Sequence, residues 1–543
     1  MARAFAYSIP AVLVFAVITT TAFPSNIHKS MTRAERMAVF GSADSVPEYQ
    51  VFPMSLSGTR RRREAGAKLE LKVEIGGKNV DLNLEPTTGT LVTKFTPVWS
   101  ATTDVNAWKN IRYDPLTTAM SDIGEFEMYR DVENEAAITV FDDPEEEIVI
   151  EGVITSDYAI RSLPKRLMGE RLHVGDYLVE TPLIEKRSVA SDAEKDSRYV
   201  AVFKIPAVPK DARRSIPVDL DNLRREKRAT RKIPEAVYPE ILIVLDHNAI
   251  RDHTITQALR FMCAFWNAVD LVYSTLNKPK VHLNIAGIII AADDSATPYI
   301  AETTSVAAVP QAGDILTKMG TYFYNAQVRF PMEHYDMIVG MTTMKLCEEE
   351  TDPCKVILGY AHLNAACSSE REVSSLKTIR STGVFYYNWK FGGVDTAIHE
   401  AAHLFGVDHD EGWGMTAECD SEEGHVMAAS ALHAHQSFKW SKCSRRFFTR
   451  YFLSKDSECL DNEPLWVKPV DEVLPGRWLT MDGQCRNDGF KNACKVPKIP
   501  ICMAKGCQAE GSDECVVNQW VPLPGSKCGT NKYCNSKSNC VPE

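Results

Sequence analysis

The chain has 543 residues, of which 44% are hydrophobic, and its formal net charge at pH 7 is −11. At roughly 100–200 residues per domain, this length predicts two to four domains with enough apolar residues for a large core. The acidic balance argues against a nucleic-acid-binding protein, which would carry a basic surface.

Residues 1–22 are predicted to form a signal peptide. Arg3 supplies a positive start, residues 9–18 form a short apolar run, and Ala22 ends a plausible cleavage site. The alternative is an N-terminal anchor helix, although the run is short for a membrane span of ~20 residues. No other stretch of the sequence approaches that length. We therefore expect a secreted, extracellular protein with no membrane span.

Residues 23–228 are predicted to form a β-rich propeptide. Residues 69–75 and 80–84 alternate between apolar and polar side chains, with two glycines between them, as in a strand hairpin. At the end of this region Arg225, Lys227 and Arg228 form an Arg-x-Lys-Arg pattern. We expect a processing protease of the furin type to cut after Arg228; the alternative is a solvated basic surface. Residues 60–63 are a second candidate for cleavage.

Residues 229–463 are predicted to form an α/β domain. Continuous apolar runs indicate buried strands, and apolar residues three or four apart indicate helices. The expected strands are residues 241–245, 281–291, 335–339 and 356–361, and the expected helices are residues 255–276 and 312–328. Because strands alternate with helices, we expect a mainly parallel, twisted sheet.

One segment of this domain has the pattern of a catalytic metal site. It reads His399-Glu400-x-x-His403-x-x-Gly406-x-x-His409-Asp410. Histidines four residues apart lie on one side of a helix, so both imidazoles can bind one cation. Gly406 lets the chain leave the helix in a left-handed turn, which can bring His409 round as a third ligand. Three protein ligands leave a fourth position open, as in catalytic zinc sites.

Glu400 is the predicted general base of this site. From the position next to the first ligand, its carboxylate can reach a zinc-activated water without being a ligand, and it can pass the proton on to the leaving amine. The alternative is a chance pair of surface histidines. The further matches at Gly406, His409 and Asp410 lower that chance to roughly one in a million. We expect Asp410 to orient the turn that carries the third histidine.

The last part of the chain, residues 464–543, is predicted to be a small disulfide-rich module. All 15 cysteines lie between Cys263 and Cys540, and eight of them fall in the last 59 residues. In an exported chain such density indicates a disulfide scaffold for a segment too small to be held by its core. A cytosolic zinc ribbon, the alternative, needs paired Cys-x-x-Cys spacings that this sequence lacks.

The segment from His399 to Asp410 resembles the active site of the reprolysin metzincins (M12B), the family of snake-venom metalloproteases and of the ADAM and ADAMTS enzymes. Residues 424–430 match the methionine turn of that family, which would place Met427 beneath the three histidines. Residues 474–541 are similar to the disintegrin-like, cysteine-rich region of ADAMTS enzymes. The compact build is similar to salivary metalloproteases of ticks. The resemblance implies a metzincin fold and zinc as the catalytic cofactor.

The resemblance also implies a structural calcium site. Its ligands would be Glu240, Asp336, the backbone carbonyl of Cys459, and Asn462, for which Asp461 could substitute. Oxygen ligands of this kind suit calcium. The alternative is a set of ordinary surface carboxylates.

The disulfides implied by the resemblance are Cys367–Cys459, Cys419–Cys443 and Cys347–Cys354. They leave Cys263, which we expect to be a buried core thiol. The propeptide contains no cysteine. Latency through a propeptide thiolate on zinc, which many reprolysins use, is therefore not available to this chain.

Together these features predict a secreted zinc metalloendopeptidase that hydrolyses extracellular proteins. The resemblance suggests matrix proteins or fibrin(ogen) as substrates, with an anti-haemostatic role if the protein is salivary. The alternative is a binding or antagonist protein that acts through its cysteine-rich tail.

Overall fold

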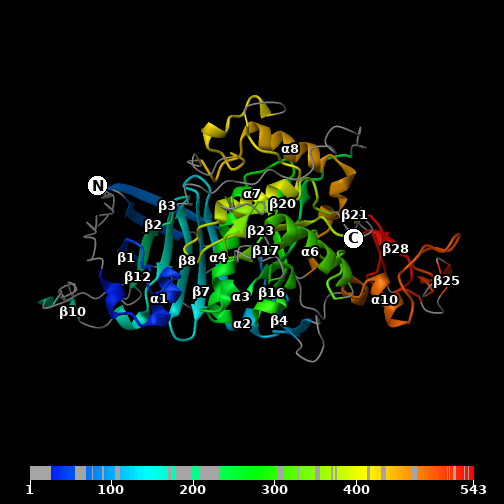
Figure 1. Ribbon diagram of the computed structural model, residues 1–543, viewed down its shortest axis with the longest axis horizontal. Helices are drawn as coiled ribbons and strands as arrows, with labels where there is room; N and C mark the ends of the chain where they lie inside the picture. Colours follow the sequence, from blue (N-terminus) through cyan, green and yellow to red (C-terminus); the bar gives the residue numbers. More distant parts are fainter. Residues whose placement is uncertain are drawn as a thin grey trace, which may run out of the picture.

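The computed structural model shows two large β-sheets separated by one long helix, with a small module at one end (Figure 1). It describes residues 26–55, 69–75, 77–87, 91–103, 111–168, 173–174, 177–178, 197–206, 231–301, 310–327, 329–348, 355–367, 371–373, 376–411, 416–429, 436–465, 474–509, 512, 514–517, 521–530, 532–535 and 537–542. The predicted signal peptide, the basic run at 60–63 and the predicted cleavage site (Arg225, Lys227 and Arg228) lie outside these residues. Within them, no helix is long and apolar enough to cross a bilayer.

The N-terminal region forms an eight-stranded antiparallel sheet in the order β1-β12-β9-β8-β7-β6-β3-β2. Its strands are β1 (Tyr49–Ser55), β2 (Leu69–Ile75), β3 (Lys78–Pro86), β6 (Phe126–Asp131), β7 (Ala136–Asp143), β8 (Glu147–Thr155), β9 (Tyr158–Ser162) and β12 (Ser197–Lys204). The two strands expected at 69–75 and 80–84 are the hairpin β2–β3. Alternate residues of β3, such as Leu82 and Leu84, are buried, as the period of two predicts.

The second sheet has seven strands in the order β20-β23-β17-β14-β16-β4-β5. These are β4 (Val98–Thr103), β5 (Ile111–Pro115), β14 (Glu240–Leu245), β16 (Asn284–Ala291), β17 (Met337–Thr342), β20 (Gly359–Ala361) and β23 (Thr382–Tyr386). The inner strands from β4 to β23 are parallel to one another, whereas β5 and β20 are antiparallel at the two edges. Every residue of β14, β16 and β17 is buried, as their continuous apolar runs predict.

The expectation of a mainly parallel sheet therefore describes only the centre of this sheet, and most strand pairs elsewhere in the described chain are antiparallel. Parallel neighbours need a long crossover connection. Helices provide it between β14 and β16 and between β16 and β17, whereas the described residues between β17 and β23 form only short strands. β4 and β5 follow each other closely in sequence and pair as a hairpin instead. Both strands come from the predicted propeptide, so the domain boundary predicted at residue 228 assigned them to a different domain from the rest of this sheet.

Helix α4 (Ile255–Tyr273) lies between the two sheets (Figure 1). It packs on β7 and β8 of the N-terminal sheet and on α7 (Val394–Leu404) of the second region. All residues from Ala258 to Tyr273 are buried, because a helix enclosed on both sides has no solvent-facing stripe. A capping box between Thr254 and Gln257 starts the helix.

The remaining elements are shorter or lie at the periphery. The helices are α1 (Arg33–Phe40), α2 (Ala119–Asp122), α3 (His247–Ile250), α5 (Pro298–Ala301), α6 (Ala312–Asn325), α8 (Lys442–Phe452), α9 (Pro475–Trp478) and α10 (Met481–Asn487), with 3-10 turns η1 (Ile27–Ser30), η2 (Lys165–Met168), η5 (Asp294–Ala296), η7 (Ser421–Glu423) and η9 (Lys455–Asp461). The short strands are β10 (His173–Val174), β11 (Tyr177–Leu178), β13 (Ala236–Val237), β15 (Lys280–Val281), β18 (Leu346–Cys347), β19 (Val356–Ile357), β21 (Arg371–Val373) and β22 (Leu376–Thr378).

The C-terminal module consists of α9, α10 and five short strands: β24 (Gly506–Gln508), β25 (Cys515–Val517), β26 (Lys527–Gly529), β27 (Lys532–Cys534) and β28 (Cys540–Pro542). Its disulfides are Cys485–Cys507, Cys494–Cys515, Cys502–Cys534 and Cys528–Cys540. They use all eight cysteines of the predicted disulfide-rich tail. The module contacts the second region through His334, whose Nε2 lies 2.8 Å from the carbonyl oxygen of Arg477.

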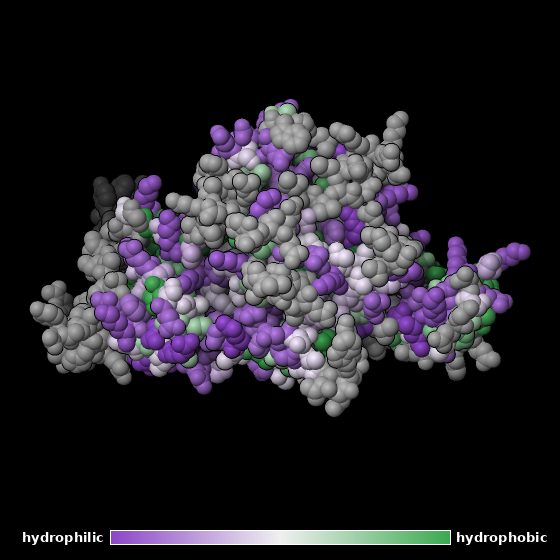
Figure 2. Space-filling model, in the orientation of Figure 1, coloured by the Kyte–Doolittle hydropathy of each residue, from purple (hydrophilic) through white to green (hydrophobic). Residues whose placement is uncertain are grey.

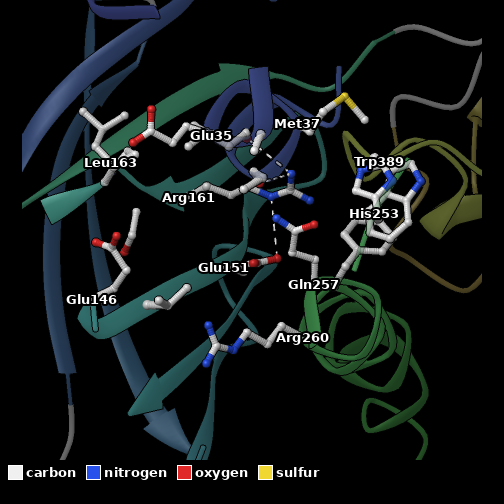
Figure 3. Close-up of a pocket in the computed structure, with 17 residues that line it drawn as sticks. Glu35, Met37, Glu146, Glu151, Arg161, Leu163, His253, Gln257, Arg260 and Trp389 are labelled. Carbon is white, nitrogen blue, oxygen red and sulfur yellow. Dashed lines mark hydrogen bonds and ion pairs between the residues drawn. The ribbon is translucent and has the colours of Figure 1, made fainter. Parts of the chain in front are cut away.

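A cavity of about 270 Å³ lies between the N-terminal sheet and α4 (Figure 3). The His253 ring stacks on Trp389 with centroids 3.6 Å apart. Neither ring nitrogen of His253 finds a hydrogen-bond partner among the described residues. Burial, reinforced by the positive charge of Arg161, lowers the pKa of His253 from 6.5 to about 4. The charged groups that line the cavity are Glu35, Glu146, Glu151, Arg161 and Arg260, and Asp252 adjoins His253 in the chain.

Because of His253, the protein is expected to lose stability as the pH falls from 6.5 towards 4. In this window the unfolded chain protonates the histidine and the folded chain does not, so unfolding takes up a proton. The loss from this group is at most about 3 kcal/mol. A His253→Phe variant keeps the stack on Trp389 but cannot titrate. Urea denaturation at pH 7.5 and pH 4.5 should show a smaller loss for the variant, and an equal loss would contradict this assignment.

Candidate metal centre

Three histidines meet at the end of α7. His399 and His403 lie one turn apart on this helix and are fully buried, and His409 follows it and is 2% exposed. The Nε2 atom of His399 is 3.0 Å from Nε2 of His403 and 3.0 Å from Nε2 of His409. Two nitrogens bound to one tetrahedral zinc at roughly 2.0–2.1 Å lie about 3.3 Å apart. The set therefore fits one zinc ion.

The backbone selects the tautomer of the first two histidines. The Nδ1 atom of His399 lies 2.8 Å from the carbonyl oxygen of Val426, and Nδ1 of His403 lies 2.7 Å from that of Val407. A carbonyl oxygen only accepts hydrogen bonds, so each Nδ1 carries the proton and donates it. Each Nε2 is then left with a lone pair that can bind a cation, as in other histidine metal sites.

Gly406 turns the chain so that His409 can reach the other two histidines. Its φ is +75°, in the left-handed region, and its N–H donates to the carbonyl oxygen of His403 at 2.8 Å. A Cβ at this position would lie 3.0 Å from Oδ1 of Asn364. Both the backbone angle and the close neighbour favour glycine.

Asp410 ties this turn to the segment around Met427. The N–H of Asp410 donates to the carbonyl oxygen of Met427 at 2.8 Å, and Ser441 Oγ donates to Asp410 Oδ1 at 2.8 Å. Met427 is fully buried. Burial raises the pKa of Asp410 to about 6. The neighbouring Val426 holds His399, so one segment supports both the first and the third histidine.

Glu400 lies beneath the edge strand β20. Its side chain is 2% exposed. A Cβ on Gly359 of β20 would lie 2.6 Å from Glu400 Oε1 and 2.5 Å from its Cγ. The carboxylate therefore packs directly against the backbone of β20, and only a glycine leaves room for it. Sequence reasoning missed Gly359; the signal available was a glycine inside an expected strand, which often marks a close approach.

The residues proposed for calcium also lie together, where the neighbouring strands β14 and β17 begin. The N–H of Glu240 donates to Asp336 Oδ2 at 2.9 Å, and Asn462 Nδ2 donates to Glu240 Oε2 at 2.7 Å. Asp336 also lies against the disulfide between Cys367 and Cys459. Asp461, the proposed substitute for Asn462, pairs instead with Arg231.

The electrostatics of this second cluster favour a cation. Glu240 and Asp336 are both buried. Burial and the charge of Asp336 raise the pKa of Glu240, and burial raises the pKa of Asp336 to about 8. A divalent ion would offset the cost of two buried carboxylates, but the assignment to calcium remains a prediction.

The cysteines of the second region are placed as follows. Cys367 is bonded to Cys459, and Cys419 is bonded to Cys443, which are two of the pairs that the resemblance implies. Cys354 lies outside the described residues, so its pairing with Cys347 stays a prediction. Cys263 is a free, buried thiol on α4, and burial raises its pKa.

Comparison with known proteins places this geometry in a family. Residues 260–410 match the model of the reprolysin-like metallopeptidase family M12B. Over 520 residues the chain is 29% identical to a silk moth (Bombyx mori) protein described as "a disintegrin and metalloproteinase with thrombospondin motifs like", covering 87% of this chain and 72% of that protein. The chain carries a reprolysin-type metalloprotease region at residues 260–410.

Other relatives of this reprolysin-type chain are mammalian. It is 24% identical over 327 residues to a disintegrin and metalloproteinase with thrombospondin motifs 7 of Rattus norvegicus, covering 59% of this chain but 19% of that protein. The chain thus spans only a small part of its mammalian relatives. Metalloproteinase-II from Bacteroides fragilis superimposes with a TM-score of 0.33 at 9% identity, covering 71% of this chain and 91% of that one; so loose a likeness carries no argument.

Proposed function

We propose that this reprolysin-type chain is a secreted zinc endopeptidase, made as a precursor and cut after Arg228, that hydrolyses extracellular proteins with Glu400 as its general base. The proposal rests mainly on three buried histidines that meet at one point. Next to the first of them in the chain, the buried carboxylate of Glu400 packs against the edge strand β20. Matrix proteins and fibrin(ogen) are the proposed substrate class.

The chain's own residues supply most of the reaction. His399, His403 and His409 would hold the zinc ion, which when bound supplies a Lewis acid and acidifies water. Glu400 accepts the proton of the attacking water and donates it to the leaving amine. Its placement beneath β20 puts the base next to the strand along which an extended substrate would lie.

The proposed substrate position follows from the sheet. β20 ends the seven-stranded sheet, pairing with β23 on one side only in the sheet order. An extended peptide can add to such an edge through backbone hydrogen bonds. We propose that the substrate backbone pairs with β20 beside Gly359, so that its scissile carbonyl reaches Glu400 and the histidines.

One observation favours an additional binding role for the tail. Most of the exposed large hydrophobic side chains among the described residues lie in the C-terminal module: Leu474, Ile499, Met503, Val517 and Val521. Hydrophobic residues are visible on this module at the right of Figure 2. Exposed apolar side chains that gather in one patch mark interaction sites. The tail would then select protein substrates for the catalytic region.

The decisive test is cleavage of gelatin and fibrinogen by the secreted, processed protein, with and without a zinc chelator. We expect cleavage that the chelator abolishes and that added zinc restores. The same assay on a short peptide separates catalysis from tail-assisted binding. A biological effect that persists in full with chelator would instead support the alternative of a binding protein acting through the tail.

A further inference from the structure

The N-terminal region and the catalytic region share one hydrophobic core. Residues of both regions belong to one hydrophobic cluster, which includes Phe141 and Phe203 from the first and Phe265 and Leu404 from the second. We propose that residues 26–206 stay bound as a permanent subunit after the chain is cut at Arg228, giving a two-chain protease. This inference rests on the proposed processing of the precursor.

The first argument is that the N-terminal region completes the catalytic sheet. β4 pairs in parallel with β16, with Val98 opposite Ile288 and Ala101 opposite Ala291. The backbone N–H of Ile288 donates to the carbonyl oxygen of Pro97 at 2.9 Å. Without β4, a fully buried apolar strand would become an open edge, which sheets normally avoid.

Side chains reinforce this strand pairing. Thr103 donates to Asp293 from its backbone N–H at 2.8 Å and from its hydroxyl at 2.6 Å. The Tyr113 hydroxyl lies 2.6 Å from that of Tyr322. Trp99 contacts Phe330 edge to face, with ring centroids 5.2 Å apart. The contact therefore combines backbone pairing, hydrogen bonds and aromatic packing.

The second argument comes from α4, which presents buried charges to the N-terminal sheet. Arg130 of β6 pairs with Asp270 of α4 at 2.5 Å, and Arg260 of α4 pairs with Asp143 of β7 at 2.6 Å. All four side chains are at most 14% exposed. Separating the regions would leave each pair without its partner and expose the apolar face of α4. A large apolar face that is covered only in the complex is typical of obligate interfaces, whereas transient interfaces are more polar.

The third argument is the position of Arg161 of β9. Its guanidinium lies over the rings of Phe261 and Phe391 of the catalytic region, with its Cζ 5.3 Å from each ring centroid. Its Nη1 donates to the carbonyl oxygens of Ala38 and Val39, and Figure 3 shows it reaching into the cavity beside Glu151. Buried arginines on aromatic rings are typical anchors of tight interfaces.

The test uses the full chain carrying Glu400→Ala, with a site for a specific protease introduced between residues 207 and 230. After complete cutting, the two fragments are run on a gel-filtration column in buffer and again in urea. We expect them to elute together in buffer, even after dilution to nanomolar concentration, and to separate only in urea. Separate peaks in buffer, with the catalytic fragment still folded by near-UV circular dichroism, would overturn the proposal.

A pair of variants locates the interaction. Arg130→Ala should raise the dissociation rate of the cut protein at least tenfold, because it leaves Asp270 buried and unpaired. The control is Lys439→Ala, which removes a lysine that is 59% exposed and pairs with Glu135 at 3.5 Å across the same interface; this change should leave the rate unchanged. Equal rates for both variants would contradict the role of the buried charges. If Arg130→Ala fails to fold, the parent protein still decides the question.

These experiments do not depend on proteolytic activity. N-terminal sequencing of the secreted protein shows whether it is cut after Arg228. An uncut protein would refute the proposed processing, while the gel-filtration result would still decide whether the two regions stay together.

Discussion

Replacing Glu400 by Ala is expected to lower kcat by about 10³- to 10⁴-fold while the protein keeps its fold and its zinc. The Glu400 carboxylate takes no part in the backbone hydrogen bonds that orient His399 and His403, so these two metal ligands should keep their orientation. What is lost is a proton acceptor and donor at the reacting bond, an effect that general acid–base catalysis supports at this size.

Peptide cleavage, zinc content and thermal denaturation should be measured together on the same preparation. Glu400→Gln, which keeps the side-chain volume, should show the same loss of kcat. Glu422→Gln, on an exposed glutamate of the loop before Met427, should retain full activity. Peptidase activity near the wild-type level in Glu400→Ala, with zinc bound, would remove Glu400 from its assigned role.

A second large effect is expected for Gly359→Ala, which should lower kcat by about 100-fold. The new Cβ would stand 2.5–2.7 Å from three atoms of the Glu400 side chain, so the carboxylate must move. Because the displaced group is the end of a flexible side chain, the strand and the fold should survive. A displacement of about 1 Å at a reacting group can cost about 10²-fold in rate.

Gly359 is a positioning residue, and the measurement must separate this role from a structural one. We expect a fall in kcat with a smaller change in KM, a shifted pH profile of kcat, and unchanged zinc content and melting temperature. The control is Gly313→Ala, whose Cβ would make only an ordinary 3.7 Å contact with Tyr360 of the same strand. A rise in KM alone would mean that the methyl group blocks substrate and leaves Glu400 in place.

The sequence was sufficient for the parts of the site that lie within a few residues of one another. His399 and His403 share a helical face because of their spacing alone, and Gly406 reverses the chain within one turn. The disulfides of Cys367 and Cys419 needed the family resemblance, since their partners lie 92 and 24 residues away. The sequence also indicated the buried strands β14 and β17 correctly.

The contact of Gly359 with Glu400 was not predictable from the sequence. The two residues lie on different elements, an edge strand and a helix. Neither segment carries a sequence signal that indicates a contact with the other. Their proximity depends on how β20 pairs with β23 and on how α7 packs beneath the sheet. A single chain sequence shows the glycine but not what it accommodates.

The sequence by itself determined the catalytic motif, the disulfide-rich tail and the positions of most buried strands, because each of these depends on local spacing, composition or a continuous apolar run. Tertiary structure decided that β4 and β5 of the predicted propeptide join the catalytic sheet and that α4 is buried on both sides. The physical reason is that an apolar strand or helix face can be covered by any partner of matching shape. Which partner covers it depends on the packing of segments far apart in the chain, here β4 against β16 across about 190 residues.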